Sequence, residues 1–379
     1  MHKIYTLGAK MLFKYGTVAT GRYFYDRSKM QREIEFFLKG GQSFMIKAPR
    51  RYGKTSLIEN CLQINKLEYF YADFRKTPRV EIFNNKLIEY IYSRLGLKGA
   101  IKQLQSNAVA FLREHKSTIS IDVSLFEASV ELFSSSVVSQ EERLIEALDM
   151  TQKIAKELNT TFYIVFDEFQ DVKRLSTSGV DLLELMRGVM QHHEDVCYVF
   201  AGSHMTLMTE IFENKKSPFF NFCRKFKLDA FDTDELLGEL LEAFKSRGIL
   251  FESDALLKDV LARLKGHPAN TMLVMQFIES MASREDVKLI KKELVELAYE
   301  KAHEELQDLI NEYLKEIKTK EHLHDVIYRL ANGEKQVLEP SSLRQKRAYL
   351  VDMGYISRVG RGEYEIIDGF LEEELKESL

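Results

Sequence analysis

Short apolar runs alternate with longer amphipathic segments along the first 230 residues or so of the chain. The apolar runs are bounded by glycine, proline or acidic residues, which is typical of buried strands. In the segments between them apolar residues recur every three to four positions, the period of a helix that packs on one face. This alternation predicts a parallel α/β sheet covered by helices on both faces. The predicted strands are Phe44–Lys47, Leu67–Ala72, Phe162–Phe166, Val196–Ala201 and Phe226–Leu228, and the predicted helices are Ser56–Asn65, Glu81–Leu95, Glu141–Leu158 and Val180–His192.

Two later parts of the chain have different patterns. Residues 117–138 alternate apolar and polar positions, which predicts a β-like insertion in the α/β core. From about residue 232 the spacing is helical and we expect no strand until the final segment, where two short runs flank a Gly-Arg-Gly turn. The predicted domains are therefore an α/β core at 1–231, an all-α domain at 232–318 and a winged-helix domain at 319–379.

A phosphate-binding motif follows the first predicted strand directly. The segment 48–56 reads APRRYGKTS and leads into a helix, which fits the P-loop pattern except that Ala48 replaces the first glycine. Gly53 permits the tight turn that points backbone N–H groups at a phosphate, Lys54 adds a positive charge, and the Thr55 hydroxyl is a ligand for Mg²⁺. A chance match in a strand–turn–helix unit is the alternative, and Ala48 keeps it open.

A pair of carboxylates ends the third predicted strand. The apolar run 162–166 leads into Asp167 and Glu168. In a P-loop ATPase the first carboxylate holds Mg²⁺ through water, and the second is the general base for the attacking water. An apolar run that ends in two acids is a weak signal alone, but together with the P-loop it predicts a nucleotide site at the carboxyl ends of the strands.

Two more polar residues fit the same predicted site. Ser203 follows the fourth strand, where its hydroxyl can contact the γ-phosphate or the attacking water, and a plain Gly202-Ser203 turn is an equal alternative. Arg224 precedes the fifth strand, where a guanidinium can reach a γ-phosphate of its own or of a neighbouring subunit. A structural salt bridge explains an isolated arginine equally well.

These residues together resemble the archaeal-type ATPase family within the AAA+/STAND class of P-loop ATPases. The double arginine of the P-loop is the most specific part of the resemblance, and Ala48 and Cys223 depart from the family pattern. The resemblance implies an AAA+-like α/β sheet with strand order 5-1-4-3-2, followed by an all-α lid and a C-terminal winged helix. The matching segments are 25–27, 48–57, 166–170, 201–203, 217–224, 266–268 and 355–368.

The resemblance also implies a function. It implies a nucleotide-binding hydrolase that uses ATP and Mg²⁺ and couples hydrolysis to a change in the angle between core and lid. The expected catalytic residues are Glu168, Lys54, Arg224 and Ser203, and the expected Mg²⁺ ligands are Thr55 and Asp167. The residues expected to contact the nucleotide are Tyr25, Asp26 and Arg27 near the adenine, Pro49, Arg50, Arg51, Tyr52, Gly53, Lys54, Thr55 and Ser56 in the P-loop, and His267 and Pro268 at the start of a lid helix.

A second hypothesis makes DNA binding the main role and the nucleotide mainly structural, as in archaeal origin-recognition initiators. Between residues 341 and 361 five basic residues stand against one acid, Asp352. A basic recognition helix and wing can contact phosphates and a groove of duplex DNA. A winged helix used for protein contacts remains the alternative, because the acids at 372–374, expected on a solvated helix face, weaken the positive field. The five basic residues are Arg344, Lys346, Arg347, Arg358 and Arg361.

Composition narrows the classes of protein that the chain can be. Its 54 basic and 58 acidic residues give a net charge of −4, which excludes a polycation that coats nucleic acid. The three cysteines lie far apart and are expected to be buried free thiols in a reducing compartment. His192 and His193 are expected at a solvated helix end rather than in a metal site. No apolar run is long enough for a transmembrane helix, so we expect a cytoplasmic protein, and the oligomeric state stays open.

Overall fold

The computed structural model of the chain describes residues 11–96, 124, 127, 139–175, 181–320, 323–333, 341–360 and 362–377. Its contacts divide the chain into two compact units. Unit 1 consists of residues 1–31, 48–60 and 228–379, and unit 2 consists of residues 32–47 and 61–227. The predicted insertion at 117–138 lies almost entirely outside the described residues. The domain boundaries at 231 and 318 stay predictions.

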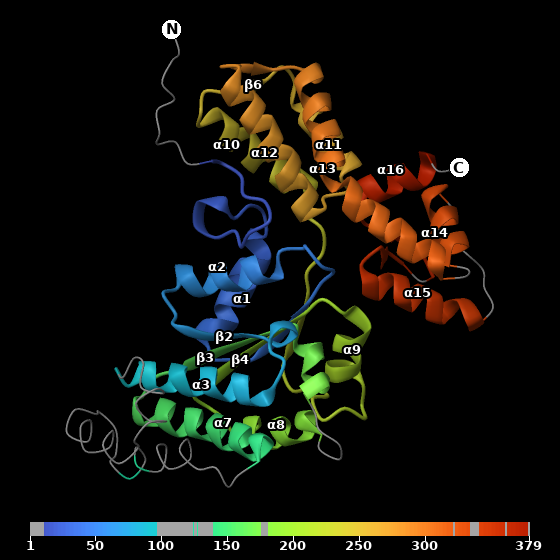
Figure 1. Cartoon of the computed structure of the whole chain (residues 1–379). Coiled ribbons are helices and arrows are strands. Elements are labelled where there is room, and N and C mark those ends of the chain that lie inside the picture. The colour runs from blue at the N-terminus through green and yellow to red at the C-terminus, as the bar shows by residue number, and fades with distance from the viewer. Residues whose placement is uncertain are drawn as a thin grey trace. The chain divides into compact units, whose positions relative to one another are not determined.

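A five-stranded parallel sheet forms the centre of unit 2 (Figure 1). Its strand order, β2-β3-β4-β1-β5, is the order 5-1-4-3-2 that the resemblance implied, written from the other edge. This confirms the predicted fold class of the core. The strands are β1 (Phe44–Lys47), β2 (Tyr69–Asp73), β3 (Phe162–Asp167), β4 (Val196–Gly202) and β5 (Arg224–Lys227).

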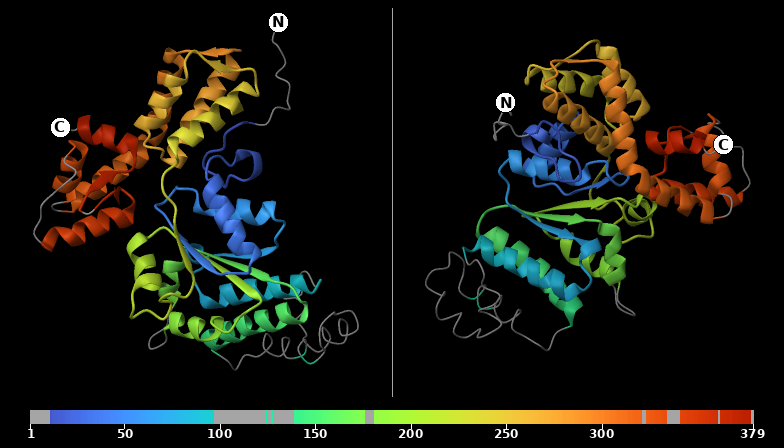
Figure 2. Two further views of the ribbon diagram at one scale, coloured as in Figure 1. Left: turned by 180° about the vertical axis from the view of Figure 1, so that it is seen from behind. Right: turned by 45° about the horizontal axis from the view of Figure 1, so that its top comes forward.

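Three helices of unit 2 lie together on one face of this sheet, as Figures 1 and 2 show from different sides. They are α3 (Val80–Arg94), α7 (Gln140–Glu157) and α8 (Leu182–Met190). Helix α7 begins with a capping box, in which Ser139 and Glu142 each bind the other's backbone N–H. The central strands β3 and β4 are buried at every residue, because helices cover the sheet.

The strand edges differ slightly from the prediction. Strand β5 begins at Arg224, so this arginine is the first strand residue rather than a residue before the strand. The reason is pairing with β1, in which Phe44 lies opposite Arg224. Phe226 is the buried residue of β5 and packs edge-on against Phe37 of α1 (Ser28–Lys39), a helix whose residues from 32 onward belong to unit 2.

The helical part of unit 1 contains a strand pair that the sequence did not predict. Strands β6 (Leu250–Phe251) and β7 (Leu289–Ile290) are parallel to each other, so the expectation of no strands between 232 and 318 is wrong. Each strand is only two residues long, too short for apolar periodicity to reveal. The helices here are α10 (Thr233–Lys245), α11 (Asp254–Arg263), α12 (Pro268–Arg284) and α13 (Lys292–Thr319).

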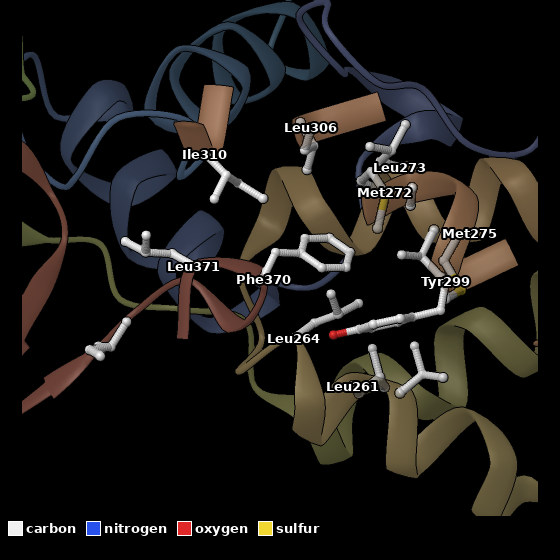
Figure 3. Close-up of a cluster of buried hydrophobic side chains, with 14 of the residues drawn as sticks. Leu261, Leu264, Met272, Leu273, Met275, Tyr299, Leu306, Ile310, Phe370 and Leu371 are labelled. Atoms are coloured by element: carbon white, nitrogen blue, oxygen red, sulfur yellow. The ribbon is translucent and has the colours of Figure 1, made fainter. Parts of the chain in front are cut away.

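The end of unit 1 has the helices and the hairpin that the sequence predicted. Helices α14 (Leu323–Ala331) and α15 (Ser341–Met353) precede the antiparallel strands β8 (Ile356–Arg358) and β9 (Tyr364–Ile366), and α16 (Gly369–Glu377) follows. Buried side chains of α11, α12, α13 and α16 form one continuous cluster (Figure 3). In it the ring of Phe370 lies 4.8 Å from that of Tyr299.

The three consecutive acidic residues of α16 contact side chains of neighbouring elements and do not form the solvated face that the sequence led us to expect. Glu372 pairs with Lys265 at 2.5 Å and Glu373 with Arg263 at 3.3 Å. Glu374 lies 3.2 Å from the His303 ring. The periodicity of α16 shows which face is apolar, but only the packed fold shows that basic residues of its neighbours lie against the other face. No described helix is long and apolar enough to cross a membrane.

Candidate functional site

The P-loop belongs to unit 1 and has the backbone of an anion-binding turn. Arg51 and Gly53 have φ of 65° and 83°, in the left-handed region. Helix α2 (Lys54–Ile64) begins directly after this turn. The first N–H groups of a helix have no partner within it, and the helix dipole adds partial positive charge, so both favour an anion.

Lys54 turns back into this loop. Its side chain is buried, and Nζ donates to the carbonyl oxygens of Ala48 at 3.1 Å and Pro49 at 3.3 Å. The loop therefore holds a buried ammonium group beside its own carbonyls. Ala48 is fully buried, so the loop accommodates the Cβ that stands in place of the usual glycine.

The turn that opens helix α12 packs against the P-loop within unit 1. The rings of His267 and Tyr52 lie edge to face, 5.2 Å apart. His267 is the N-cap of α12, where Nδ1 accepts the N–H of Asn270 at 3.3 Å, and Pro268 is the first helical residue. Burial lowers the pKa of His267, which favours the neutral ring that this acceptor role needs. At Gly266, with φ of 63°, an added Cβ would meet a backbone oxygen at 2.6 Å.

The second P-loop arginine contacts residues from two distant parts of unit 1. Arg51 donates to the hydroxyl of Tyr15, and its charge acts on Tyr313 of α13, whose pKa is raised by burial and lowered in part by Arg51. An added Cβ on Gly354, just after α15, would lie 3.3 Å from the Cβ of Pro49. Helix α13 and the residue after α15 therefore both approach the loop, whereas Arg50 is exposed.

The segment Tyr25–Arg27 lies against the chain that leads into α10. Asp26 accepts the N–H of Asp232 at 3.1 Å, and Arg27 donates to the carbonyl of Ala230 at 3.1 Å. Asp26 and Arg27 have positive φ, 57° and 74°, and burial raises the pKa of the Asp26 carboxyl. Burial also raises the pKa of Tyr25 to about 12, so its hydroxyl stays protonated and donates to the backbone of residue 12.

Unit 2 holds the two predicted carboxylates at the end of β3. Asp167 is buried, its Oδ2 accepts the hydroxyl of Tyr71 at 2.6 Å, and its Oδ1 accepts the N–H of Glu168 at 2.9 Å. Sequence reasoning missed Tyr71. The only available signal was its position in the strand β2, which pairs with β3.

Glu168 and Ser203 are brought together, as the prediction of a shared site requires. Both the hydroxyl and the N–H of Ser203 donate to Oε2 of Glu168, at 2.6 and 3.1 Å. Gln170 donates to the same oxygen at 2.7 Å and was not predicted to take part. Glu168 itself has φ of 49°, an uncommon conformation for a residue with a side chain.

Arg224 lies close to an acidic residue, Glu33, as the alternative interpretation of a structural salt bridge requires. Its guanidinium lies 3.8 Å from the carboxylate of Glu33 and 6.0 Å from the ring centre of Phe37, both on α1. The side chain is 60% exposed. A residue so exposed remains accessible to a neighbouring molecule as well as to Glu33.

Three of the five residues of the predicted basic patch have side chains in the described part of the chain. Arg347 of α15 lies over the ring of Tyr364 at 4.9 Å, and the exposed Arg358 donates to the carbonyl of Gly360 at 2.9 Å. Lys346 is half-buried. The side chain of Arg344 and the whole of residue 361 lie outside the described residues.

The histidine pair departs from expectation at one residue. His192 is exposed, but His193 is half-buried and its Nδ1 lies 2.7 Å from the hydroxyl of Tyr198. The His193 ring packs against the ring of Tyr198 in β4, so the expectation of a solvated helix end is wrong for His193. The three cysteines are free, with Cys61 and Cys197 buried and Cys223 partly so. In the described ranges no cluster of three or more His, Cys, Asp or Glu side chains suits a metal ion.

Comparisons with known proteins bear on the fold. No family model and no curated protein matches the sequence. The structure is similar to that of a Walker-type ATPase of Pyrococcus abyssi, with a TM-score of 0.64 and 19% identity, over 97% of this chain and 100% of that one. It is also similar to an ORC2 protein of Aeropyrum pernix in ADPNP–ADP complexes, with a TM-score of 0.51 and 13% identity, over 93% and 92% of the two chains. At these identities the comparisons show a shared fold.

Proposed function

We propose that the protein is a Mg²⁺-dependent ATP hydrolase of the AAA+/STAND type. The observation that carries this proposal is the P-loop, in which the buried Lys54 is turned onto the carbonyls of a loop with two left-handed residues. A buried ammonium is costly unless it is paired, and here the carbonyl oxygens of the loop accept its N–H groups. We expect the phosphates of a nucleotide to replace them.

The residues proposed to hold the nucleotide have distinct tasks. Gly53, Thr55 and Ser56 supply backbone N–H groups at the start of α2, Lys54 supplies charge, and Tyr52 packs the loop against the lid. Tyr25, Asp26 and Arg27 are proposed to lie near the adenine. Of the flanking loop residues, Arg50 is exposed and accessible to phosphate.

The proposed metal ligands suit Mg²⁺ chemically. The Thr55 hydroxyl and the Asp167 carboxylate offer oxygen atoms, which Mg²⁺ prefers, and the bond from Tyr71 orients the carboxylate. When bound, Mg²⁺ would neutralise charge on the β- and γ-phosphates. This oxygen donor set is the reason for proposing Mg²⁺ rather than zinc.

Glu168 is the proposed general base. A carboxylate that accepts a proton from water must be held in one orientation, and the bonds from Ser203 supply that constraint. Arg224 is proposed to stabilise the γ-phosphate, of its own or of a neighbouring subunit, because its side chain is exposed.

The lid is proposed to change its angle during turnover. Within unit 1, His267 packs on Tyr52, so a rearrangement of the P-loop bears directly on the first turn of α12. A nucleotide shifts such an equilibrium by its difference in affinity for the two states.

Two substitutions test the proposed function. Lys54→Ala should abolish binding of a fluorescent ATP analogue, because the phosphate charge loses its partner. Glu168→Gln should keep nucleotide binding but lower kcat by roughly 100-fold or more, since general-base catalysis contributes about that much. Phosphate release and equilibrium titration measure the two effects, and Lys258→Ala, an exposed lysine of the lid, is the control. A Lys54→Ala protein that binds and hydrolyses ATP normally would contradict the proposal.

A DNA-binding regulator is the second candidate function. The observation in its favour is that Glu372 and Glu373 are ion-paired with Lys265 and Arg263, so these acids oppose the basic residues of α15 and β8 less than their sequence position suggests. Lys346, Arg347 and Arg358 would then contact the phosphates of duplex DNA.

Salt-dependent titration separates the two candidates. Charge reversal of Arg344, Lys346 and Arg347 to Glu should remove duplex affinity, and in the natural protein that affinity should fall steeply between 50 and 200 mM salt, as roughly expected for phosphate contacts. The matched control reverses three exposed lysines of unit 1, Lys288, Lys291 and Lys292. Equal affinity of the two triple variants would exclude the C-terminal patch as the DNA site.

A further inference from the structure

Gln170 is a buried polar side chain in unit 2 to which no role has so far been given. It lies in η3 (Phe169–Leu175), the short 3₁₀ helix after β3, between the core residues Phe169 and Val172, and only 6% of it is exposed. Burying an amide costs free energy unless its polar atoms are bonded. Its position therefore calls for an explanation.

The amide is only half satisfied. Nε2 donates to Oε2 of Glu168 at 2.7 Å, while Oε1 is buried without a hydrogen-bond partner among the described residues. Exchange of the two amide atoms would direct Oε1 at the carboxylate, which repels it. The bond to Glu168 thus determines which way the amide faces, at the cost of an unpaired acceptor.

Three donors converge on this single carboxylate oxygen. Two come from Ser203 at the end of β4 and one from Gln170, so the carboxylate is held from two different elements. Glu168 also has a left-handed backbone, which costs of the order of 1 kcal/mol and is stable only when its surroundings compensate. The side-chain bonds provide such compensation.

Gly202 leaves the room that the amide occupies. A Cβ at residue 202 would overlap Oε1 of Gln170 and the side chain of Met208. Because the φ of Gly202 is not in the left-handed region, space rather than backbone conformation accounts for the glycine. Gly202, Ser203 and Gln170 together form the surroundings of the Glu168 carboxylate.

We infer that Gln170 is a positioning residue for the general base Glu168, and that it acts by holding, together with Ser203, the Oε2 atom of the Glu168 carboxylate. The inference rests on the proposed function for its effect on turnover, but the contact itself does not depend on catalysis. Gln170 acts through Glu168 and has no part in nucleotide binding.

The test compares Gln170→Met with Gln152→Met. Gln152 makes the same kind of bond, from its amide to the carboxylate of Asp195, but at the amino end of β4. Gln170→Met should lower kcat roughly 10- to 100-fold, the size expected of a misplaced catalytic group, with the Kd of a fluorescent ATP analogue within about twofold. Gln152→Met should leave both unchanged, and Gln170→Met should have no further effect on the residual hydrolysis of Glu168→Gln.

Urea unfolding tests the contact between Gln170 and Glu168 without any measurement of catalysis, so it can fail or succeed independently of the proposed function. The urea midpoints of Gln170→Met, Glu168→Gln and the double variant should be non-additive, as expected for residues in contact. If the natural protein releases no phosphate from ATP, the proposed function fails while non-additive midpoints still support the contact. Three results would each overturn the inference. They are additive midpoints, a kcat that Gln170→Met leaves unchanged, and a loss of kcat on adding Gln170→Met to Glu168→Gln that equals the loss in the natural protein.

Discussion

Several non-glycine residues of this chain have backbone conformations that only a few residues in a folded protein adopt. Among them are Arg27, Arg51 and Glu168, with φ of 74°, 65° and 49°. All three belong to segments that the sequence singled out for nucleotide binding or catalysis. Strain of this kind persists where the surroundings determine the conformation, and it is common at functional sites. At these three positions the backbone and the motifs coincide, whereas Lys66, Asn159, Lys265 and Asp286 have positive φ outside the motifs.

The titration of a single residue, His193, should make the free energy of unfolding depend on pH. Burial lowers its pKa from 6.5 to about 4. Between these two pH values the unfolded chain binds a proton at this ring and the native chain does not, so the free energy of unfolding falls as the pH is lowered. The contribution is at most about 3.5 kcal/mol, since one pKa unit corresponds to about 1.4 kcal/mol.

The measurement compares urea unfolding of the natural protein and of His193→Gln between pH 4 and pH 6.5. The amide of the variant can still bond the hydroxyl of Tyr198, but it does not titrate. We expect the variant to lose less stability on acidification. Identical slopes for both proteins would show that His193 is protonated as readily in the native state as in the unfolded one.

Helix α16 is the element whose role changed most between sequence and structure. Its apolar residues Phe370, Leu371 and Leu375 are fully buried, and its acids contact side chains of α11, of α13 and of the turn after α11. Gly369 at its start comes so close to the carbonyl of Arg263 that no side chain fits there. Helix α16 thus packs against the helices α11 and α13 of unit 1 through both its apolar and its acidic residues.

Removing the main apolar contact of α16 should loosen the end of unit 1. Phe370→Ala should lower the free energy of unfolding by about 3 kcal/mol, because it opens a cavity beside Tyr299. The same change at Phe36, which is 73% exposed, should cost less than about 0.5 kcal/mol. Denaturant unfolding of both variants measures the difference. Equal losses would mean that α16 is not packed as described.

At the scale of the whole molecule, the proposed nucleotide should stabilise the native chain. A ligand that binds only the native state at 100 times its Kd adds about 2.7 kcal/mol to the free energy of unfolding. Thermal unfolding with increasing ATP and Mg²⁺ should therefore shift Tm upward for the natural protein and for Lys258→Ala, and should leave Lys54→Ala unchanged. A Tm shift that persists in Lys54→Ala would place the stabilising ligand outside the P-loop.

The sequence by itself determined the local structure of this protein. The periods of its apolar residues predicted the five strands of the sheet and most of the helices, although not α9 (Met205–Glu213), and the motif at 48–56 located the P-loop. Helix, strand and turn preferences depend on neighbours only a few residues away. The strand order agreed with the one that the family resemblance implied.

Only the tertiary structure decided which distant residues meet. Tyr71 and Asp167, Gln170 and Gly202, and Lys265 and Glu372 are pairs from different parts of the chain, and the two-residue strands β6 and β7 exist because they pair with each other. No local pattern distinguishes a glutamine in a buried 3₁₀ helix from one on the surface. Hydrogen bonds and ion pairs between elements depend on how the apolar faces pack, so their partners become defined only when the chain is folded.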